Sequence, residues 1–302
     1  MSATIGFVGL GHMGGSMASR YLAAGYPVYG HTRSKERAGG LLEDGVRWCE
    51  TPRELAQAVE VVFTSIPDDD ALADVASGDD GILAGLEAGK TWLDVSTVSP
   101  RASREVAAGA LERGAVMLDA PVSGSVPQVQ SGTLTIMVGG DEDAYERVEP
   151  ILRELGTPTR IGENGQGLVL KLAINISLAL QALAFSEGLL LAERDGIDRQ
   201  LAAEQMSSSP IGSPMLKARV PLFLDSSRQA WFDIGLMNKD IRLARSTASE
   251  LGIRLPAAAV ADEVLAEGAA RGFAHRDIAA LHELLDERAS AGDKGGSERP
   301  TR

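Results

Sequence analysis

The chain lacks the residues that build disulfide frameworks and most metal sites. Cys49 is the only cysteine among 302 residues, so no disulfide can form within the chain and no cysteine-rich metal site is expected. The four histidines, His12, His31, His275 and His282, are scattered without the close spacing of metal ligands. We therefore expect no metal site, and the lone cysteine suits a reducing compartment, the cytoplasm.

Positive charge is also scarce. Lys and Arg total 29 against 42 Asp and Glu, which leaves a net charge of −13. This balance disfavours nucleic acid and anionic membrane surfaces as partners. A small anionic ligand would need a local cationic pocket.

No long apolar run is free of polar residues. The longest, 168–192, is interrupted by Lys171, Asn175, Gln181 and Glu187, which predicts a buried helix of a soluble protein rather than a membrane span. The N-terminus lacks a basic segment followed by an apolar core, so no signal peptide is expected. The run has more hydrophobic surface than one domain contact could cover, which predicts a homodimer or homotetramer built through the helical part of the chain.

The two halves of the chain differ in their patterns. The first half alternates apolar strand-like runs with helical patterns, and the second reads as helices alone, which predicts a Rossmann-type doubly wound α/β sheet followed by an all-helical domain. We expect domains at 1–163 and 164–290 and a disordered polar tail at 291–302. Helix breaks are expected near Gly196, at 207–214, at Pro221, at 252–256 and at Gly272. The expected strands are Thr4–Val8, Val28–Tyr29, Val59–Thr64, Thr91–Val95, Ala115–Leu118 and Thr133–Val138.

A glycine-rich loop follows the first strand. Strand, GxGxxG and helix in this order predict a dinucleotide site, with Gly9 for the tight turn, Gly11 for close approach of a pyrophosphate and Gly14 for helix packing. The alternative is a glycine turn without a ligand. The residues expected to contact the cofactor are Gly9, Leu10, Gly11, His12, Met13 and Gly14.

The end of the second strand bears on the choice of cofactor. An NAD enzyme usually has a carboxylate there for the ribose hydroxyls, and this chain has Thr32, Arg33 and Ser34 instead. Arg33 and Ser34, with Lys35 or Arg37, could bind a 2′-phosphate, so we expect NADP, with NAD possible. The alternative is that these are solvated charges at a helix start.

Lys171 and Asn175 are the most informative polar pair. Their i, i+4 spacing places both side chains on one face of a helix. A lysine in an apolar helix either reaches solvent or is kept for chemistry. The polar groups that follow on this helix are few and short, so the pattern favours a lysine kept for chemistry over a solvated one.

Five segments in this order resemble the β-hydroxyacid dehydrogenase family, which includes 3-hydroxyisobutyrate dehydrogenases and tartronate, glyoxylate and succinic semialdehyde reductases. The resemblance runs from about Ile5 to about Leu285. The segments are 9–14 (GLGHMG), 94–100 (DVSTVSP), 119–125 (DAPVSGS), 162–175 (GENGQGLVLKLAIN) and 232–240 (FDIGLMNKD).

The resemblance implies roles for individual residues. It makes Lys171 the catalytic lysine and Asn175 its neighbour at the substrate. It implies substrate contacts at Ser123, Gly124, Ser125, Phe232 and Asp240, and further cofactor contacts at Ile66, Pro67, Ser96, Thr97 and Lys239. The implied activity is reduction of a small carboxylate-bearing carbonyl, or oxidation of the matching 3-hydroxy acid.

Ser125 departs from the family pattern, which usually has a second glycine there. Its side chain could narrow the carboxylate pocket or add a hydroxyl donor, so the substrate stays open. Two alternatives remain. Imine reductases resemble the fold but commonly lack the lysine at position 171, and a non-catalytic nucleotide-binding scaffold is compatible with the fold alone.

Overall fold

The computed structural model describes residues 3–293. They form two compact units, with the boundary between Leu172 and Ala173. This boundary lies within a long helix, whereas we expected it before that helix, at residue 163.

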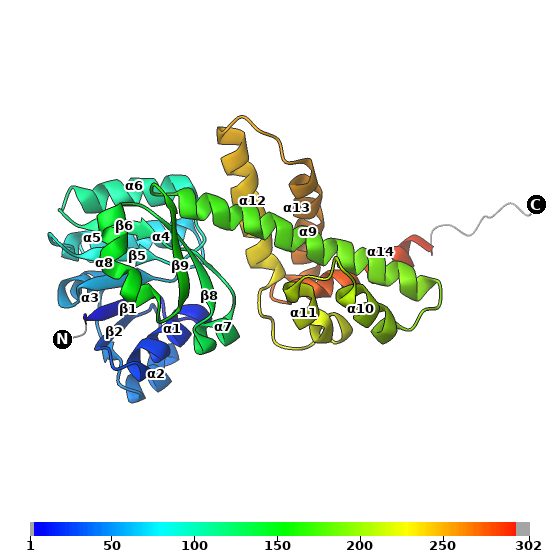
Figure 1. Ribbon diagram of the computed structural model, residues 1–302, viewed down its shortest axis with the longest axis horizontal. Helices are drawn as coiled ribbons and strands as arrows, with labels where there is room; N and C mark the ends of the chain where they lie inside the picture. Colours follow the sequence, from blue (N-terminus) through cyan, green and yellow to red (C-terminus); the bar gives the residue numbers. More distant parts are fainter. Residues whose placement is uncertain (1–2, 294–302) are drawn as a thin grey trace, which may run out of the picture. The chain divides into compact units, whose positions relative to one another are not determined.

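The first unit is an α/β unit (Figure 1). Its elements are β1 (Ile5–Val8), α1 (His12–Ala23), β2 (Val28–His31), η1 (Lys35–Ala38), α2 (Gly39–Glu43), β3 (Arg47–Trp48), α3 (Pro52–Ala58), β4 (Val61–Thr64), α4 (Asp69–Ala76), α5 (Ile82–Gly85), β5 (Thr91–Asp94), α6 (Pro100–Leu111), β6 (Val116–Asp119), β7 (Val122–Ser123), α7 (Val126–Ser131), β8 (Leu134–Gly139), α8 (Glu142–Leu152), β9 (Gly156–Gly162) and the start of α9 (Gln166–Arg194).

The sheet confirms the predicted Rossmann-type fold. Its order is β3-β2-β1-β4-β5-β6-β8-β7, with β9 beside β8. The chain turns outward in both directions from β1 and β4, and the loops after such strands hold ligands in open α/β sheets. All six expected strands are present. The two-residue strands β3 and β7 and the seven-residue strand β9 were not predicted.

We had expected a fully parallel sheet, but part of it is antiparallel. β8 runs antiparallel to β6 and β7. The reason is local: β7 follows β6 after two residues, and only the short helix α7 separates it from β8, so there is no crossover helix to return the chain in parallel.

Both faces of the sheet are buried. On β4, Val61 and Phe63 pack on one side with helices α1 and α8, and Val62 packs on the other with α3, α4 and α6. This alternation explains why the strands read as continuous apolar runs. Figure 1 shows these helices on the two sides of the sheet.

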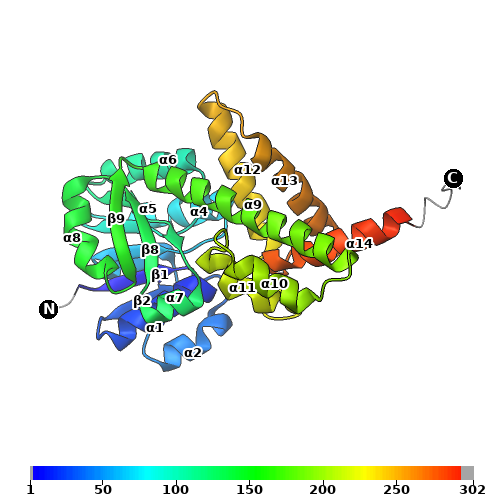
Figure 2. The ribbon, with the colours of Figure 1, turned by 45° about the vertical axis from the view of Figure 1, so that its right-hand side comes forward.

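The second unit is helical, as predicted. Figure 2 shows α12 and α13 side by side. After α9 the elements are α10 (Arg199–Ser208), α11 (Pro214–Leu224), α12 (Ile234–Glu250), α13 (Pro256–Gly268), η2 (Ala269–Phe273), η3 (Ile278–Ala280) and α14 (Leu281–Asp293).

Two boundary predictions in the second unit were wrong. Helix α11 continues past Pro221 to Leu224, so this proline, which removes one helical N–H bond, does not end the helix. Helix α14 extends to Asp293, three residues into the expected tail. The remaining part of that tail lies outside the described residues.

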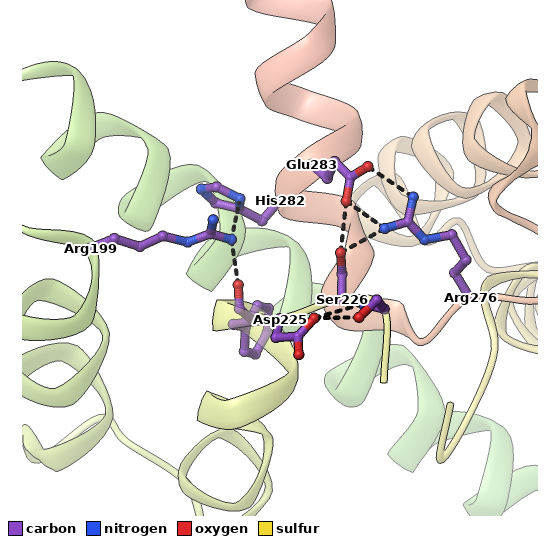
Figure 3. Close-up of polar contacts among 8 residues, drawn as sticks. Arg199, Asp225, Ser226, Arg276, His282 and Glu283 are labelled. Carbon is purple, nitrogen blue, oxygen red and sulfur yellow. Dashed lines mark hydrogen bonds and ion pairs between the residues drawn. The ribbon is translucent and has the colours of Figure 1, made fainter. Parts of the chain in front are cut away.

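A partly buried polar cluster connects α14 with neighbouring segments of the second unit (Figure 3). Arg276 forms an ion pair with Glu283 and donates to Ser226 Oγ at 2.6 Å. The buried His282 lies 3.1 Å through Nδ1 from Arg199 Nη2. Ser226 Oγ in turn donates to Glu283 Oε2 at 2.7 Å, and this bond fixes the segment that follows α11.

Helix α9 is long and apolar enough to cross a membrane by length and composition, and 39% of its most apolar window is buried. We had expected a buried helix. Leu191 is 74% exposed and Leu170 is 38% exposed. The helix therefore leaves apolar surface uncovered in the single chain.

Candidate active site

The glycine loop has the geometry of a dinucleotide site. Gly9 has φ +96°, and a Cβ there would lie 2.2 Å from the Ser65 carbonyl oxygen. A Cβ on Gly14 would lie 2.1 Å from the Gly9 oxygen, so helix and loop touch. Nothing lies within 4 Å of a Cβ built on Gly11. This open space, at the start of α1 and without an acidic residue in the first turn of that helix, fits an approaching pyrophosphate.

Two basic residues close after β2, Arg33 and Lys35, differ in their contacts. Thr32, Arg33 and Ser34 follow the strand directly. Lys35 Nζ lies 3.2 Å from Glu50 Oε1 and 5.0 Å from the centre of the Trp48 ring. Arg33 is exposed and pairs with no carboxylate in the part of the chain that the structure describes. Arg33 is therefore better placed than Lys35 to bind a ribose 2′-phosphate.

Ser96 joins two loops at the carboxyl edge of the sheet. Its hydroxyl oxygen accepts a hydrogen bond from the Ile66 N–H at 2.9 Å, and its own N–H donates to Asp94 Oδ1 at 3.2 Å. Thr64 Oγ1 donates to the same carboxylate oxygen at 2.7 Å. This network fixes the segments that contain Pro67 and Thr97, so Ser96 shapes this edge through its loop contacts.

The Ser123 loop leaves the sheet at β7. Gly124 has φ +132°, and a Cβ there would lie 2.6 Å from Leu134 Cδ2. Ser125 donates to Gln128 Oε1 through both its N–H, at 2.9 Å, and its hydroxyl, at 3.0 Å. The Ser125 hydroxyl is thus engaged with the first turn of α7, and Ser123 and Gly124 remain half-buried and exposed respectively.

Lys171 is buried, with 9% of the residue exposed. It lies in the second turn of α9, in the part of that helix that belongs to the first unit. Lys171 is therefore not a solvated surface lysine. Removing an ammonium group from water is costly, and a buried lysine needs compensating partners.

Asn175 lies one turn further along α9 and is 1% exposed. Its Nδ2 donates to Asp240 Oδ2 at 2.6 Å, and Lys239 Nζ lies 2.9 Å from Asp240 Oδ1. The buried Asn175 Oδ1 has no hydrogen-bond partner among residues 3–293. Because Nδ2 donates to Asp240, Oδ1 is the atom of this amide that can accept a hydrogen bond.

Phe232 is held by a residue that the sequence did not suggest. Asp277 Oδ2 accepts from the N–H groups of Trp231, at 2.9 Å, and Phe232, at 3.1 Å. Arg219 Nε lies 3.2 Å from the other oxygen of this buried carboxylate. Asp277 is far away in sequence, so no local pattern identifies it. Gln128, by contrast, completes an S-x-x-Q capping box that could have been recognised.

Residues 3–293 contain no group of three or more His, Cys, Asp or Glu side chains arranged to hold a metal ion. Cys49 is buried, and burial, with Glu54 and Glu50 nearby, raises the pKa of its thiol to about 11. It is therefore a poor nucleophile.

Two protein-family models and several known proteins match this chain. The NAD binding domain of 6-phosphogluconate dehydrogenase matches residues 4–165, and the NAD-binding domain of NADP-dependent 3-hydroxyisobutyrate dehydrogenase matches residues 165–285. The chain is 35% identical over 283 residues to the 2-hydroxy-3-oxopropionate reductase of Escherichia coli (strain K12), covering 93% of this chain and 97% of that protein.

Solved structures agree. The Mycobacterium tuberculosis 3-hydroxyisobutyrate dehydrogenase with L-serine superposes with a TM-score of 0.84 at 30% identity, covering 94% of this chain and 99% of that chain. The imine reductase of Myxococcus stipitatus with NADP+ gives a TM-score of 0.64 at 19% identity, covering 93% of this chain and 99% of that chain, which shows the common fold alone. The chain therefore belongs to the β-hydroxyacid dehydrogenase family of NAD(P)-dependent oxidoreductases.

Proposed function

We propose that this enzyme interconverts a small 3-hydroxy acid and its semialdehyde, with NADP as cofactor and Lys171 as general acid and base. The observation that carries the proposal is the buried Lys171 one helical turn before Asn175, whose Oδ1 is buried without a partner among residues 3–293. The carbonyl oxygen of the substrate becomes a hydroxyl in this reaction. The Lys171 ammonium can donate the proton, and Asn175 Oδ1 can accept a hydrogen bond from the hydroxyl that forms.

The chemistry divides between cofactor and protein. The reduced nicotinamide, when bound, supplies the hydride for the carbonyl carbon. As negative charge develops on the carbonyl oxygen, the Lys171 ammonium stabilises it and donates the proton, and in the reverse direction the neutral amine accepts that proton. Asn175 Oδ1 can accept a hydrogen bond from the substrate hydroxyl, because Asp240 holds the amide in one orientation.

The Ser123 loop is proposed to bind the substrate carboxylate. Ser123 offers a hydroxyl at the carboxyl edge of the sheet, and Gly124 beside it is exposed. Ser125 directs its hydroxyl to Gln128 and so adds no free donor through that bond. This supports a small carboxylate substrate in spite of the departure from the family pattern.

NADP is proposed over NAD because Arg33 is an exposed cation directly after β2. Lys35, the neighbouring candidate, is engaged with Glu50 and Trp48. The absence of an acidic residue at 32–34 supports the same choice, since a carboxylate there would bind the ribose hydroxyls and repel the phosphate.

A homodimer or homotetramer is proposed from the uncovered apolar surface. Within the second unit, α9 and α14 border a groove of about 560 Å³ lined by Leu190, Leu191, Leu285 and Ala289, with Glu187, Arg194 and Arg288 at the same groove. Exposed apolar surface of this kind is usually covered in an assembly. The cytoplasmic localisation suggested by Cys49 stays a prediction.

The test is a screen of short semialdehydes and their hydroxy acids with NADPH and NADH, using wild type, Lys171→Ala and Lys217→Ala. Lys217 is an exposed lysine and serves as the matched control. We expect Lys171→Ala to retain cofactor binding and lose turnover by about 10²-fold or more, as for other general acids that stabilise charge. Near-wild-type turnover in this variant would rule out the assignment. Absence of turnover of every carbonyl by wild type would favour the scaffold alternative.

A further inference from the structure

Asp119 is a buried carboxylate that the proposed reaction does not use. It is the last residue of β6 and has no exposed surface. Its Oδ1 accepts a hydrogen bond from the Gly165 N–H at 2.6 Å, and its Oδ2 accepts one from the Leu168 N–H at 2.9 Å. Helix α9 begins at Gln166, so these donors belong to the helix start, where N–H groups lack partners within the helix.

The surrounding sequence is shaped to admit this carboxylate. A Cβ on Gly139 would lie 2.5 Å from Asp119 Oδ1. A Cβ on Gly167 would lie 2.8 Å from Asp119 Oδ2 and 2.4 Å from the Met137 carbonyl oxygen. A larger residue at either position would push the helix start away from the sheet. The close approach of β6, β8 and α9 is therefore built around Asp119.

The contact differs from an ordinary helix cap. A capping side chain usually comes from the residue just before the helix, whereas Asp119 is 46 residues before Gly165. It therefore connects α9 to the strand that leads into the Ser123 loop. Lys171 lies three residues after Leu168, about one helical turn, so the direction of the helix at Leu168 determines where the lysine lies.

We propose that Asp119 is a positioning residue for Lys171, because it fastens the start of α9 to the carboxyl end of β6. The proposal rests on the proposed catalytic role of Lys171. The two-oxygen contact sets both the position and the rotation of the first turn, and the ammonium is thereby held relative to the loop that would bind the substrate carboxylate. A displacement of about 1 Å at a reacting group can lower a rate about 100-fold.

Asp119→Asn is the most direct variant. An amide has nearly the same shape but only one acceptor oxygen, so its NH₂ group would face one of the two backbone N–H donors. The control is Glu163→Gln, since the Glu163 carboxylate lies just before the same helix start and is 82% exposed. Asp119→Ser, a smaller side chain with a single oxygen, is the second variant if Asp119→Asn does not fold.

The experiment is a single-turnover measurement with NADPH equimolar to enzyme subunits, using a semialdehyde that wild type reduces. The amplitude counts active molecules, and the rate constant reports the chemical step. For Asp119→Asn we expect the rate constant to fall about 10-fold to 100-fold with the amplitude unchanged. Glu163→Gln should match wild type in both quantities.

Two results would overturn the positioning role: a wild-type rate constant in Asp119→Asn, or an amplitude that falls while the rate constant stays the same, which would mean that Asp119 affects folding alone. Lys171→Ala is measured in parallel. A wild-type rate constant in Lys171→Ala would contradict the proposed chemistry, and it is a separate result from the outcome for Asp119.

Discussion

The stability of the first unit should depend on pH through Asp119. Burial raises the pKa of this carboxyl to about 6, against hydrogen bonds from Gly165 and Leu168 that lower it, and the carboxylate of Asp94 on the neighbouring strand raises it further. In the unfolded chain an aspartic acid has a pKa of about 3.9. The native state therefore holds the Asp119 proton more tightly than the unfolded state does.

The sign follows from that difference. Between the two pKa values the folded chain binds more protons at this site, so the free energy of unfolding decreases most steeply as pH rises from about 4 to about 6, and the contribution levels off above about pH 7. The full shift corresponds to roughly 3 kcal/mol. Between pH 5.5 and 7.5, a range above the sequence pI of 4.8 where solubility is better, about 1 kcal/mol of it should be lost.

The assay is urea unfolding of the full chain followed by tryptophan fluorescence. In a Trp231→Phe background the remaining tryptophans, Trp48 and Trp92, both belong to the first unit and report its unfolding. The difference in free energy of unfolding between this background and its Asp119→Asn derivative should fall by about 1 kcal/mol from pH 5.5 to 7.5. Parallel pH profiles for the two proteins, or a difference that grows with pH, would refute a raised pKa at Asp119. Glu163→Gln should leave the profile unchanged because its carboxylate is exposed.

Four further results are expected. Arg33→Ala should weaken NADPH binding by roughly 1.5–3 kcal/mol and leave NADH nearly unchanged in fluorescence titrations, with Lys35→Ala as control; equal losses for both cofactors would mean that Arg33 does not bind the 2′-phosphate. Ser123→Ala should reduce the preference in kcat/KM for a semialdehyde acid over the same aldehyde without its carboxylate, and an unchanged preference would place the carboxylate elsewhere. Gly167→Ala should destabilise the first unit by more than about 2 kcal/mol in urea unfolding, because its Cβ would meet backbone, whereas Gly40→Ala meets nothing within 4 Å and should be near neutral. Leu191→Glu should shift light scattering toward the monomer mass, and an unchanged mass, as expected for the control Leu251→Glu, would remove α9 from the interface.

The parts of the site that the sequence predicted depend on short-range geometry. The glycines at positions 9, 11 and 14 lie between a strand and a helix, and their reasons are local: a positive φ, an open approach and a tight helix contact. Lys171 and Asn175 share a helix face because of helical periodicity alone. The strand runs of the first half were recognisable because a sheet buried on both faces needs continuous apolar residues.

Other features depended on which segments the fold brings together. The direction of β8 follows from the short connection through α7, which strand periodicity does not report. The bond from Asn175 to Asp240 joins residues 65 positions apart, and Asp277 reaches Phe232 across 45 positions. The Ser125 N–H and hydroxyl both donate to Gln128 Oε1, a contact that depends on how the chain folds at the start of α7.

The sequence by itself therefore determined the fold class, the dinucleotide loop and the polar pair on α9, because each is a pattern within one or two adjacent elements. Only the tertiary structure decided that Lys171 is buried, that Asn175 is oriented by Asp240, and that Asp119 fastens the start of α9 to the sheet. Those properties depend on burial and on hydrogen bonds between distant residues, and both arise when the chain packs.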